Sequence, residues 1–173
     1  MAFSHRIGKL TQSIERVGTG ESLDTVICRI TSKDLQHSTR KDWLFDWRSE
    51  LAHKQRQVFG LFAVDDPVFL HGLISLEQRP DHVFAHLIES HRVNKGRGKL
   101  YDGVLGNLVA WACQVSFKTG HYGEVVFDSK SSLRKHYGEA IGAVVLFGNR
   151  MYVPESKAQE LVERYARSWQ QGN

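Results

Sequence analysis

The chain has 173 residues, of which 41% are hydrophobic and 24% are charged. This balance is typical of a globular protein and excludes a disordered or collagen-like chain, and the length suffices to bury a core without disulfides or structural metals. The formal net charge of +4 favours anionic partners such as nucleotides, phosphates or RNA, but it selects none of them.

The N-terminal third predicts helices around a single strand. Apolar residues at spacings of three and four predict a helix over 3–17, which the following Gly-Thr-Gly would end. Residues 24–30 alternate in the manner of a strand. Residues 31–38 and 41–54 are predicted as helices, the second with two tryptophans four apart on its core face.

Three strand-like segments follow, over 56–64, 68–78 and 82–93. Short breaks containing Asp, Pro and Arg separate them, and such breaks suit antiparallel hairpins. We therefore expect a meander of three antiparallel strands.

The second half predicts alternating helices and strands. A long amphipathic helix is expected over residues 98–118, closed by a glycine, and a short buried strand over 123–128. Residues 129–140 predict another helix, and 142–153 predict a hairpin around a Gly-Asn turn. A last amphipathic helix, preceded by a proline, is expected over 155–170.

Two cysteines, Cys28 and Cys113, lie in separate apolar stretches without C-x-x-C spacing. They form neither a disulfide framework nor a metal site, so we expect reduced core residues in a cytoplasmic protein. The N-terminus lacks the apolar region of a secretory signal, and no apolar run approaches the roughly 18 residues of a membrane span.

The stretch from Asn94 to Lys99, NKGRGK, combines two glycines with three basic residues. A Walker phosphate loop is excluded because Val93 and Leu100 stand where that motif needs a glycine and a hydroxyl. A dinucleotide G-x-G-x-x-G is excluded because Tyr101 takes the place of its third glycine.

The position of this stretch, between a predicted strand and a predicted helix, still suits an anion. Glycines let the backbone approach a ligand closely, and the unpaired N–H groups and dipole of a first helical turn favour negative charge by about 0.3–1 kcal/mol. A pyrophosphate is a natural guest there. Two alternatives stay open, a solvated basic loop and a nucleic-acid contact, although no stripe of basic and aromatic residues extends the loop.

Two short runs carry a resemblance to a known family. Residues Asn94 to Gly98 match the last five positions of a [QR]-x-x-G-x-[GA] pattern whose first position is held by Val93, and LRKHYGEAIGA places Tyr137 and Gly142 in a tyrosine-to-glycine run. With the predicted order of elements, the chain resembles the GNAT (Gcn5-related) N-acetyltransferase superfamily over residues 24–153. It departs from the family pattern where Val93 replaces Gln or Arg, Ala143 replaces Phe, and Lys130 replaces an Asn beside the cofactor.

The resemblance implies an α/β (α+β) fold of three layers, in which helices flank a mixed, mostly antiparallel sheet. It predicts one domain over residues 1–173 with its core at about 24–153. The helices predicted over 3–17 and 155–170 would pack on this core, the second as an addition at the C-terminus.

The resemblance also implies CoA-dependent N-acyl transfer, directly from acetyl-CoA or another acyl-CoA as co-substrate to an amine acceptor that the sequence does not identify. The implied cofactor-binding residues are Val93, Asn94, Lys95, Gly96, Arg97, Gly98, Lys99 and Lys130.

Two catalytic roles follow from the same resemblance. Tyr137 would donate a proton to the leaving thiolate, and Glu89 would deprotonate the amine directly or through water. The residues by themselves also allow a half-buried tyrosine that packs its helix, and a surface carboxylate paired with Arg92.

Other bases for the amine are Glu77, His86 and His91. The two-residue period of a strand places His91 on the face of Glu89 and His86 on the opposite face. Because these histidines show no zinc-ligand spacing, no metal site is predicted.

Two other classes of function are compatible with the sequence. One is a GNAT-fold binding or regulatory protein without catalysis, and the other is a basic protein associated with nucleic acid. The expected partners are an acyl-CoA and an amine, with a homodimer left open and no membrane.

Overall fold

The computed structural model describes residues 9–165, which form a nine-stranded sheet with helices on both faces. The strand order is β6-β1-β2-β3-β4-β5-β7-β9-β8. The strands are β1 (Lys9–Arg16), β2 (Ser22–Arg29), β3 (Gln57–Ala63), β4 (Asp66–Gln78), β5 (Val83–Ser90), β6 (Tyr101–Asp102), β7 (Val125–Asp128), β8 (Val144–Phe147) and β9 (Arg150–Val153). The helices are α1 (Trp47–Leu51), α2 (Val104–Lys118), α3 (Arg134–Ile141) and α4 (Glu155–Tyr165).

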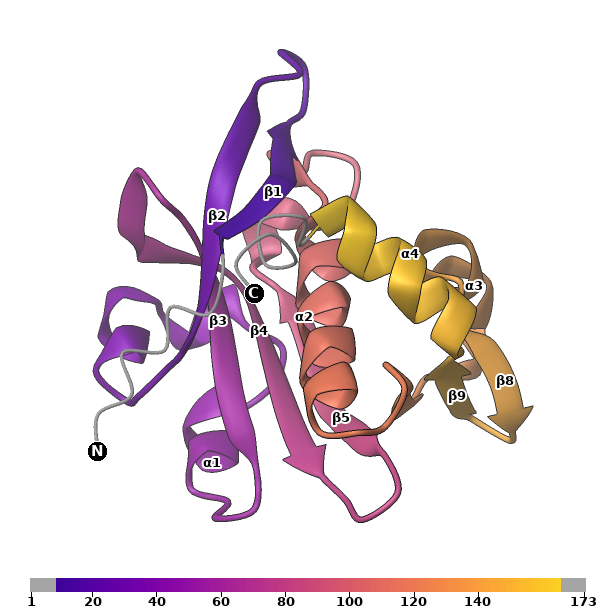
Figure 1. The fold of residues 1–173 in the computed structure, drawn as a ribbon. Coiled ribbons are helices and arrows are strands. Elements are labelled where there is room, and N and C mark those ends of the chain that lie inside the picture. Colours follow the sequence, from indigo (N-terminus) through magenta and orange to yellow (C-terminus); the bar gives the residue numbers. More distant parts are fainter. Residues whose placement is uncertain (1–8, 166–173) are drawn as a thin grey trace.

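The sheet divides the core into two clusters, and helices cover both. On one side α2 and α4 pack side by side over the sheet, while α1 lies on the other side (Figure 1). The α2 side contains the larger cluster, around Trp111 and Leu108, and the α1 side contains a smaller cluster with Trp43 and Trp47. The predicted three-layer arrangement is confirmed.

The predicted meander is confirmed as β3, β4 and β5, which pair antiparallel in sequence order. Every pairing between the described strands is antiparallel except that of β5 with β7. The sheet is therefore mixed and mostly antiparallel, as expected from the sequence.

The helix predicted over 3–17 is wrong over the described residues, because 9–16 form strand β1. Apolar residues four apart, such as Leu10 and Ile14, share a face in a helix and also in a strand, so this spacing does not distinguish the two. Pairing with β2 decides between them. Residues 1–8 of the predicted helix lie outside the described part of the chain.

The helices predicted over 31–38 and 41–54 are largely replaced by short turns. Two 3-10 turns cover Asp34–His37 and Arg40–Asp42, and α1 begins only at Trp47, capped by the Asp46 side chain on the N–H of Ser49 at 3.1 Å. Because Trp43 precedes α1, the two tryptophans do not share a helix face. They meet edge to face across the chain, with ring centroids 6.4 Å apart.

The long helix α2 begins at Val104 and not at residue 98. Residues 101–102 pair with β1 as strand β6, and Gly103 then takes a left-handed conformation with φ of +95° before the first helical turn. Arg92–Asn94 form a 3-10 turn after β5. The NKGRGK stretch is thus separated from the helix by a short strand.

The C-terminal elements follow the prediction. Strand β7, the β8–β9 hairpin with its Gly-Asn turn, and helix α4 all form. The predicted helix over 129–140 is a 3-10 turn at Ser131–Leu133 followed by α3, whose C-cap Gly142 is left-handed with φ of +70°. The apolar face of α4 is buried within the described range, through Ala158, Leu161, Val162 and Tyr165. The continuation to 170 lies outside that range.

No helix between residues 9 and 165 is long and apolar enough to cross a bilayer. Within the same range neither cysteine forms a disulfide, and Cys113 is buried while Cys28 is half-buried against the smaller core cluster.

Candidate functional site

The site begins where two neighbouring parallel strands separate. Pairing of β5 with β7 ends at Ala85 and Phe127, and a cleft of about 840 Å³ lies between the diverging strands. A bulge contributes to the separation, because Ser75 and Leu76 of β4 pair with Leu87 and Ala85, which leaves one extra residue in β5. That extra residue is His86.

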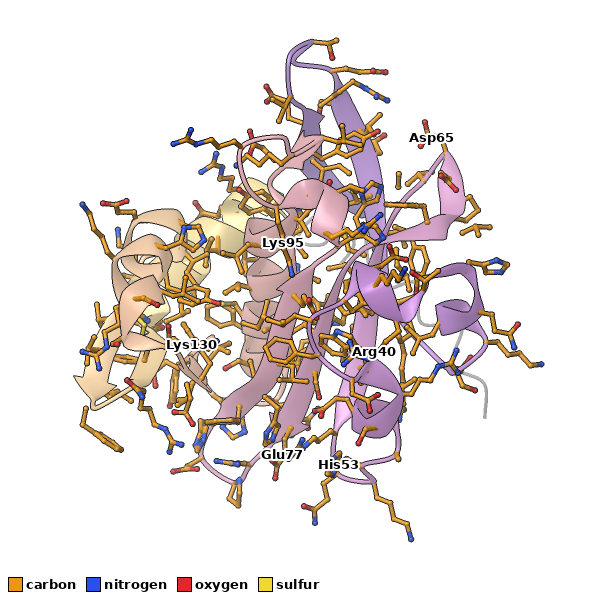
Figure 2. All side chains as sticks on the ribbon, turned by 180° about the vertical axis from the view of Figure 1, so that it is seen from behind. Arg40, His53, Asp65, Glu77, Lys95 and Lys130 are labelled. Atoms are coloured by element: carbon orange, nitrogen blue, oxygen red, sulfur yellow. The ribbon has the colours of Figure 1, made fainter. Side chains whose placement is uncertain are left out.

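The cleft is lined by the separated parts of β5 and β7, the loop after β5, the start of α2 and one side of α3. Its walls include His86, Leu87, Ile88, Glu89, Ser90, Asn94, Lys95, Gly96, Lys99, Tyr101, Asp102, Gly103, Val104, Leu105, Gly106, Phe127, Asp128, Ser129, Lys130, His136 and Tyr137. Figure 2 shows Lys95 and Lys130 on different elements, with Glu77 toward the opposite end of the sheet from Lys95.

The N-terminal turn of α2 lies against one part of the cleft, through residues 103–106. The N–H groups of a first helical turn have no partner within their own helix, and the helix dipole is positive at this end. Lys95 and Lys99 line the same cleft. Lys95 is paired with Glu89 and Lys99 with Asp102, so the backbone donors of the helix start are the part of this wall that suits an anion.

The eight residues predicted to bind a cofactor divide into two groups. Asn94, Lys95, Gly96, Lys99 and Lys130 line the cleft. The other three, Val93, Arg97 and Gly98, are not among its walls.

The glycines at 103 and 106 are the part of the site that the sequence prediction missed. Glycine is one of the favoured N-cap residues, so Gly103, directly before a helical apolar pattern, was the available signal in the sequence. A Cβ at Gly106 would stand 2.6 Å from the Tyr165 ring, so this glycine also allows α4 to pack closely on α2.

Polar side chains hold the loop after β5 in place. The buried Asn94 amide lies 3.2 Å from Nδ1 and 3.3 Å from the carbonyl oxygen of His71. The N–H of Val93 donates to His91 Nδ1 at 3.2 Å. Arg92 lies 3.4 Å from Asp42.

Glu89 is almost fully buried, with its side chain 2% exposed. It accepts from the backbone N–H groups of Leu44 at 2.5 Å and Phe45 at 3.2 Å, from the Trp47 indole at 2.8 Å and from Lys95 Nζ at 2.8 Å. A carboxylate offers about four lone-pair sites, so these donors occupy its capacity. The surface ion pair with Arg92 considered from the sequence is not formed.

Tyr137 lies on α3 at the edge of the cleft, with its ring packed edge to face on Phe127 at 5.1 Å. Burial raises the pKa of its phenol, so the hydroxyl keeps its proton at neutral pH. Within residues 9–165 its oxygen forms no hydrogen bond, which leaves it available to a ligand.

Strand periodicity had predicted His86 on the face of β5 opposite to Glu89. In the structure His86 is a wall of the cleft, as Glu89 is. The bulge at His86 interrupts the two-residue alternation, and His86 and Glu89 are both among the residues that line the cleft. His86 Nε2 is 2.6 Å from Glu77 Oε2, and this hydrogen bond, followed by the effect of Arg79, lowers the pKa of the Glu77 carboxyl.

The other candidate histidines lie outside the cleft walls. His71 and His91 are buried beneath the loop after β5, each against the ring of Phe69 with centroids 4.8 Å apart. Burial lowers the pKa of His71 to about 4 and also lowers the pKa of His91. In the described part of the chain, no three His, Cys, Asp or Glu side chains are grouped so as to hold a metal ion.

No protein-family model matches the chain, and no curated protein matches it. Solved structures do resemble it. A spermidine N-acetyltransferase from Vibrio cholerae in complex with CoA and spermine is 16% identical, with 78% of this chain and 98% of that chain covered and a TM-score of 0.53. An acyl-CoA N-acyltransferase from Pseudomonas aeruginosa is 15% identical over 77% of this chain and 100% of that one, also with a TM-score of 0.53.

A third similar structure is AtaTR bound with AcCoA, which is 16% identical over 79% of this chain and 97% of that chain, with a TM-score of 0.51. At such identities the likeness shows the fold alone. The chain has the fold of the GNAT N-acetyltransferases, and the resemblance predicted from the sequence is confirmed at that level.

Proposed function

We propose that the protein is a CoA-dependent N-acyltransferase that transfers an acyl group directly from acyl-CoA to an amine. One observation carries the proposal: the cleft between β5 and β7 joins an anion-binding helix start to a tyrosine that keeps its proton. This combination suits a long ligand with a phosphorylated end and a reactive end. The acetyltransferases and acyltransferases of the same fold support it.

The helix start would bind the pyrophosphate of CoA. The free N–H groups around Gly103 to Gly106 are donors that need no side chain, and Lys99 and Lys95 add positive charge. This assignment places the centre of the phosphate site on the helix and leaves the NKGRGK loop as its rim.

The separated part of β5 would bind the pantetheine arm. Residues 87–90 pair with β4 on one side, whereas pairing with β7 has already ended at Ala85. A strand edge that faces a cleft can pair with the amides of an extended ligand, as in strand addition by peptides. Such pairing would lead the thioester toward the point where the strands diverge.

Acyl transfer would follow at this point. The nitrogen of a neutral amine attacks the thioester carbonyl carbon, a C–N bond forms, and the C–S bond breaks with its electron pair going to sulfur. Tyr137 would give its proton to that sulfur and regain one from the nitrogen that has become positive. The products are an N-acyl amine and free CoA.

Binding of acetyl-CoA is the first test. We expect acetyl-CoA to raise the melting temperature, because a ligand of the folded state at 100 times its Kd stabilises it by about 2.7 kcal/mol. Lys99→Ala should weaken binding of acetyl-CoA but not of S-acetylpantetheine, which lacks the pyrophosphate. Lys54→Ala, at an exposed lysine outside the cleft, is the matched control. Absence of any shift with millimolar acyl-CoAs would refute the proposal.

Turnover is the second test. Tyr137→Phe should bind acetyl-CoA as the wild type does while losing most of its transferase rate, because only the proton donor is removed. If acetyl-CoA binds but the wild type acylates no amine, the alternative of a binding protein without catalysis is favoured. The observation that favours this alternative is that Glu89, the base expected from the resemblance, already accepts four hydrogen bonds.

A further inference from the structure

The amine must lose a proton before it attacks, and several side chains of the cleft could take it. Asp102 and Asp128 are paired with Lys99 and Arg150, and His136 is an exposed residue of α3. Alkylamines are protonated at neutral pH, so a base within reach of the bound amine is needed. Glu89 has its oxygens engaged by four donors. His91 is buried under the loop, outside the cleft walls, and its Nδ1 already accepts the N–H of Val93.

His86 is placed differently from both. It occupies the bulge of β5, one residue beyond the last residue that pairs with β7, and it lines the cleft. This is the point where the strands diverge and where the proposed thioester would end. Phe127, on which Tyr137 packs, is the β7 residue that pairs with Ala85. Tyr137 of α3 and His86 of β5 therefore both lie next to the Ala85–Phe127 pair, where the pairing of β5 with β7 ends.

A carboxylate orients the His86 ring. Glu77, on the neighbouring strand β4, holds Nε2 at 2.6 Å and lies toward the end of the sheet remote from Lys95 (Figure 2). In a neutral imidazole that donates its Nε2–H to a carboxylate, the lone pair is on Nδ1. Nδ1 forms no hydrogen bond to residues 9–165, and it is not one of the buried atoms without a partner, so it is accessible.

We propose that His86, oriented by Glu77, is the general base that deprotonates the acceptor amine. The inference rests on the proposed acyl transfer. His86 Nδ1 takes a proton from the ammonium group, which leaves a neutral amine and an imidazolium. The imidazolium returns the proton to water after transfer.

The charges around His86 are suited to a cation that forms transiently. Glu77 of β4 and Asp128 of β7 are negative groups near the ring, and both have lowered pKa values. Each carboxylate also has a fixed positive partner, Arg79 at 3.3 Å from Glu77 and Arg150 at 2.9 Å from Asp128. These are the charged groups that β4, its following turn, β7 and β9 direct toward His86.

The experiment compares amines that need a base with one that does not. Acetyl-CoA is assayed at pH 7 with butylamine, spermidine and Nα-acetyl-lysine, which are protonated, and with methoxyamine, which is uncharged. His86→Gln should lower kcat for the best alkylamine by about 100-fold or more, the lower range for general-base catalysis. The rate with methoxyamine and the KM for acetyl-CoA should stay close to wild type. Glu77→Gln should give a smaller loss of the same kind.

The neighbouring pair of His82 and Asp81 supplies a matched control. His82 Nδ1 is 2.7 Å from Asp81 Oδ1. His82 lies in the turn between β4 and β5, however, and is not a wall of the cleft. His82→Gln should therefore leave the alkylamine rate unchanged. The loss in His86→Gln should also diminish as pH rises and free amine becomes available from solution.

Three outcomes would overturn the inference, and they differ from one another. Equal loss with alkylamines and methoxyamine would show that His86 is structural, and an unchanged alkylamine rate would show that it is not the base. In both cases acyl transfer by the wild type still stands. Failure of the wild type to bind acetyl-CoA or to acylate any amine overturns the proposed function and this inference with it.

Discussion

The loop after β5 and the start of α2 line the same cleft, but different forces hold them in place. Side-chain polar groups hold the loop: Glu89 binds Lys95, and His71 lies against Asn94. Backbone conformation and close packing set the helix start, where Gly103 is left-handed and Gly106 touches the ring of Tyr165. The loop should therefore respond to charge and pH, and the helix start to added volume.

The comparison also separates glycines that look alike in the sequence. A Cβ at Gly96 or Gly98 would meet no atom within 4 Å, whereas one at Gly106 would clash. Two glycines close together in a basic stretch are conspicuous, but the glycines that the packing requires come later in the chain.

The largest effect is expected from Glu89→Ala. Removal of this buried carboxylate leaves three donors of residues 44–47 without their acceptor, which costs about 1–3 kcal/mol for each buried donor left unpaired. Lys95 also loses its partner, but its side chain is 42% exposed and can be solvated. Urea denaturation would measure the free energy of unfolding. Glu163→Ala, at an exposed glutamate, should change it by less than about 0.5 kcal/mol. A similar small change for Glu89 would contradict the polar anchoring of the loop.

Acid pH should weaken the loop anchor next. Burial holds the pKa of His71 at about 4, against 6.5 for a free histidine. Between these values the unfolded chain binds a proton that the folded chain does not, so stability is present above pH 6.5 and is lost as pH falls toward 4. The full loss for this group is on the order of 3 kcal/mol, since each pKa unit is worth about 1.4 kcal/mol.

Stability measured from pH 7 to pH 4 would check this dependence. His71→Gln should flatten the curve, and His53→Gln, at an exposed histidine, should not. His91, whose pKa is also lowered, should retain part of the slope in His71→Gln. A wild-type curve that is flat between these pH values would exclude a buried neutral His71.

Gly106→Ala should have a moderate effect of a different origin. Its methyl group would stand 2.6 Å from the Tyr165 ring, and overpacking of this kind costs about 1–3 kcal/mol. The loss should be independent of pH between 5 and 8, because no titrating group is involved in the clash. Thermal unfolding at several pH values would distinguish it from the loop variants.

Gly98→Ala should have the smallest effect. The position has open space and a φ outside the left-handed region, so the substitution restricts mainly the unfolded chain and can stabilise by about 0.4–1 kcal/mol. Gly96→Ala is the comparison, since φ of +72° there should cost about 1–2 kcal/mol. A large loss of acetyl-CoA affinity in Gly98→Ala would indicate that the loop, and not the start of α2, binds the pyrophosphate.

Local patterns of residues were sufficient to predict the elements whose patterns have one interpretation. The meander, β7 and the β8–β9 hairpin were predicted because alternating residues between strong turn signals are compatible with strands alone. The resemblance to the GNAT fold followed from their order. The two short motifs also pointed to Tyr137 and to basic residues, of which Lys95, Lys99 and Lys130 line the cleft.

Tertiary structure decided what local patterns leave ambiguous. Residues four apart fit a helix or a strand, and pairing with β2 made 9–16 a strand. Helix α2 begins at Val104 and not at residue 98, because residues 101–102 pair with β1 as β6 and Gly103 has a left-handed conformation. His86 entered the cleft through a bulge, which depends on the pairing of β4 with β5 and has no signature within either strand. Pairing partners and close contacts are properties of distant residues, so their consequences could be read only from the folded chain.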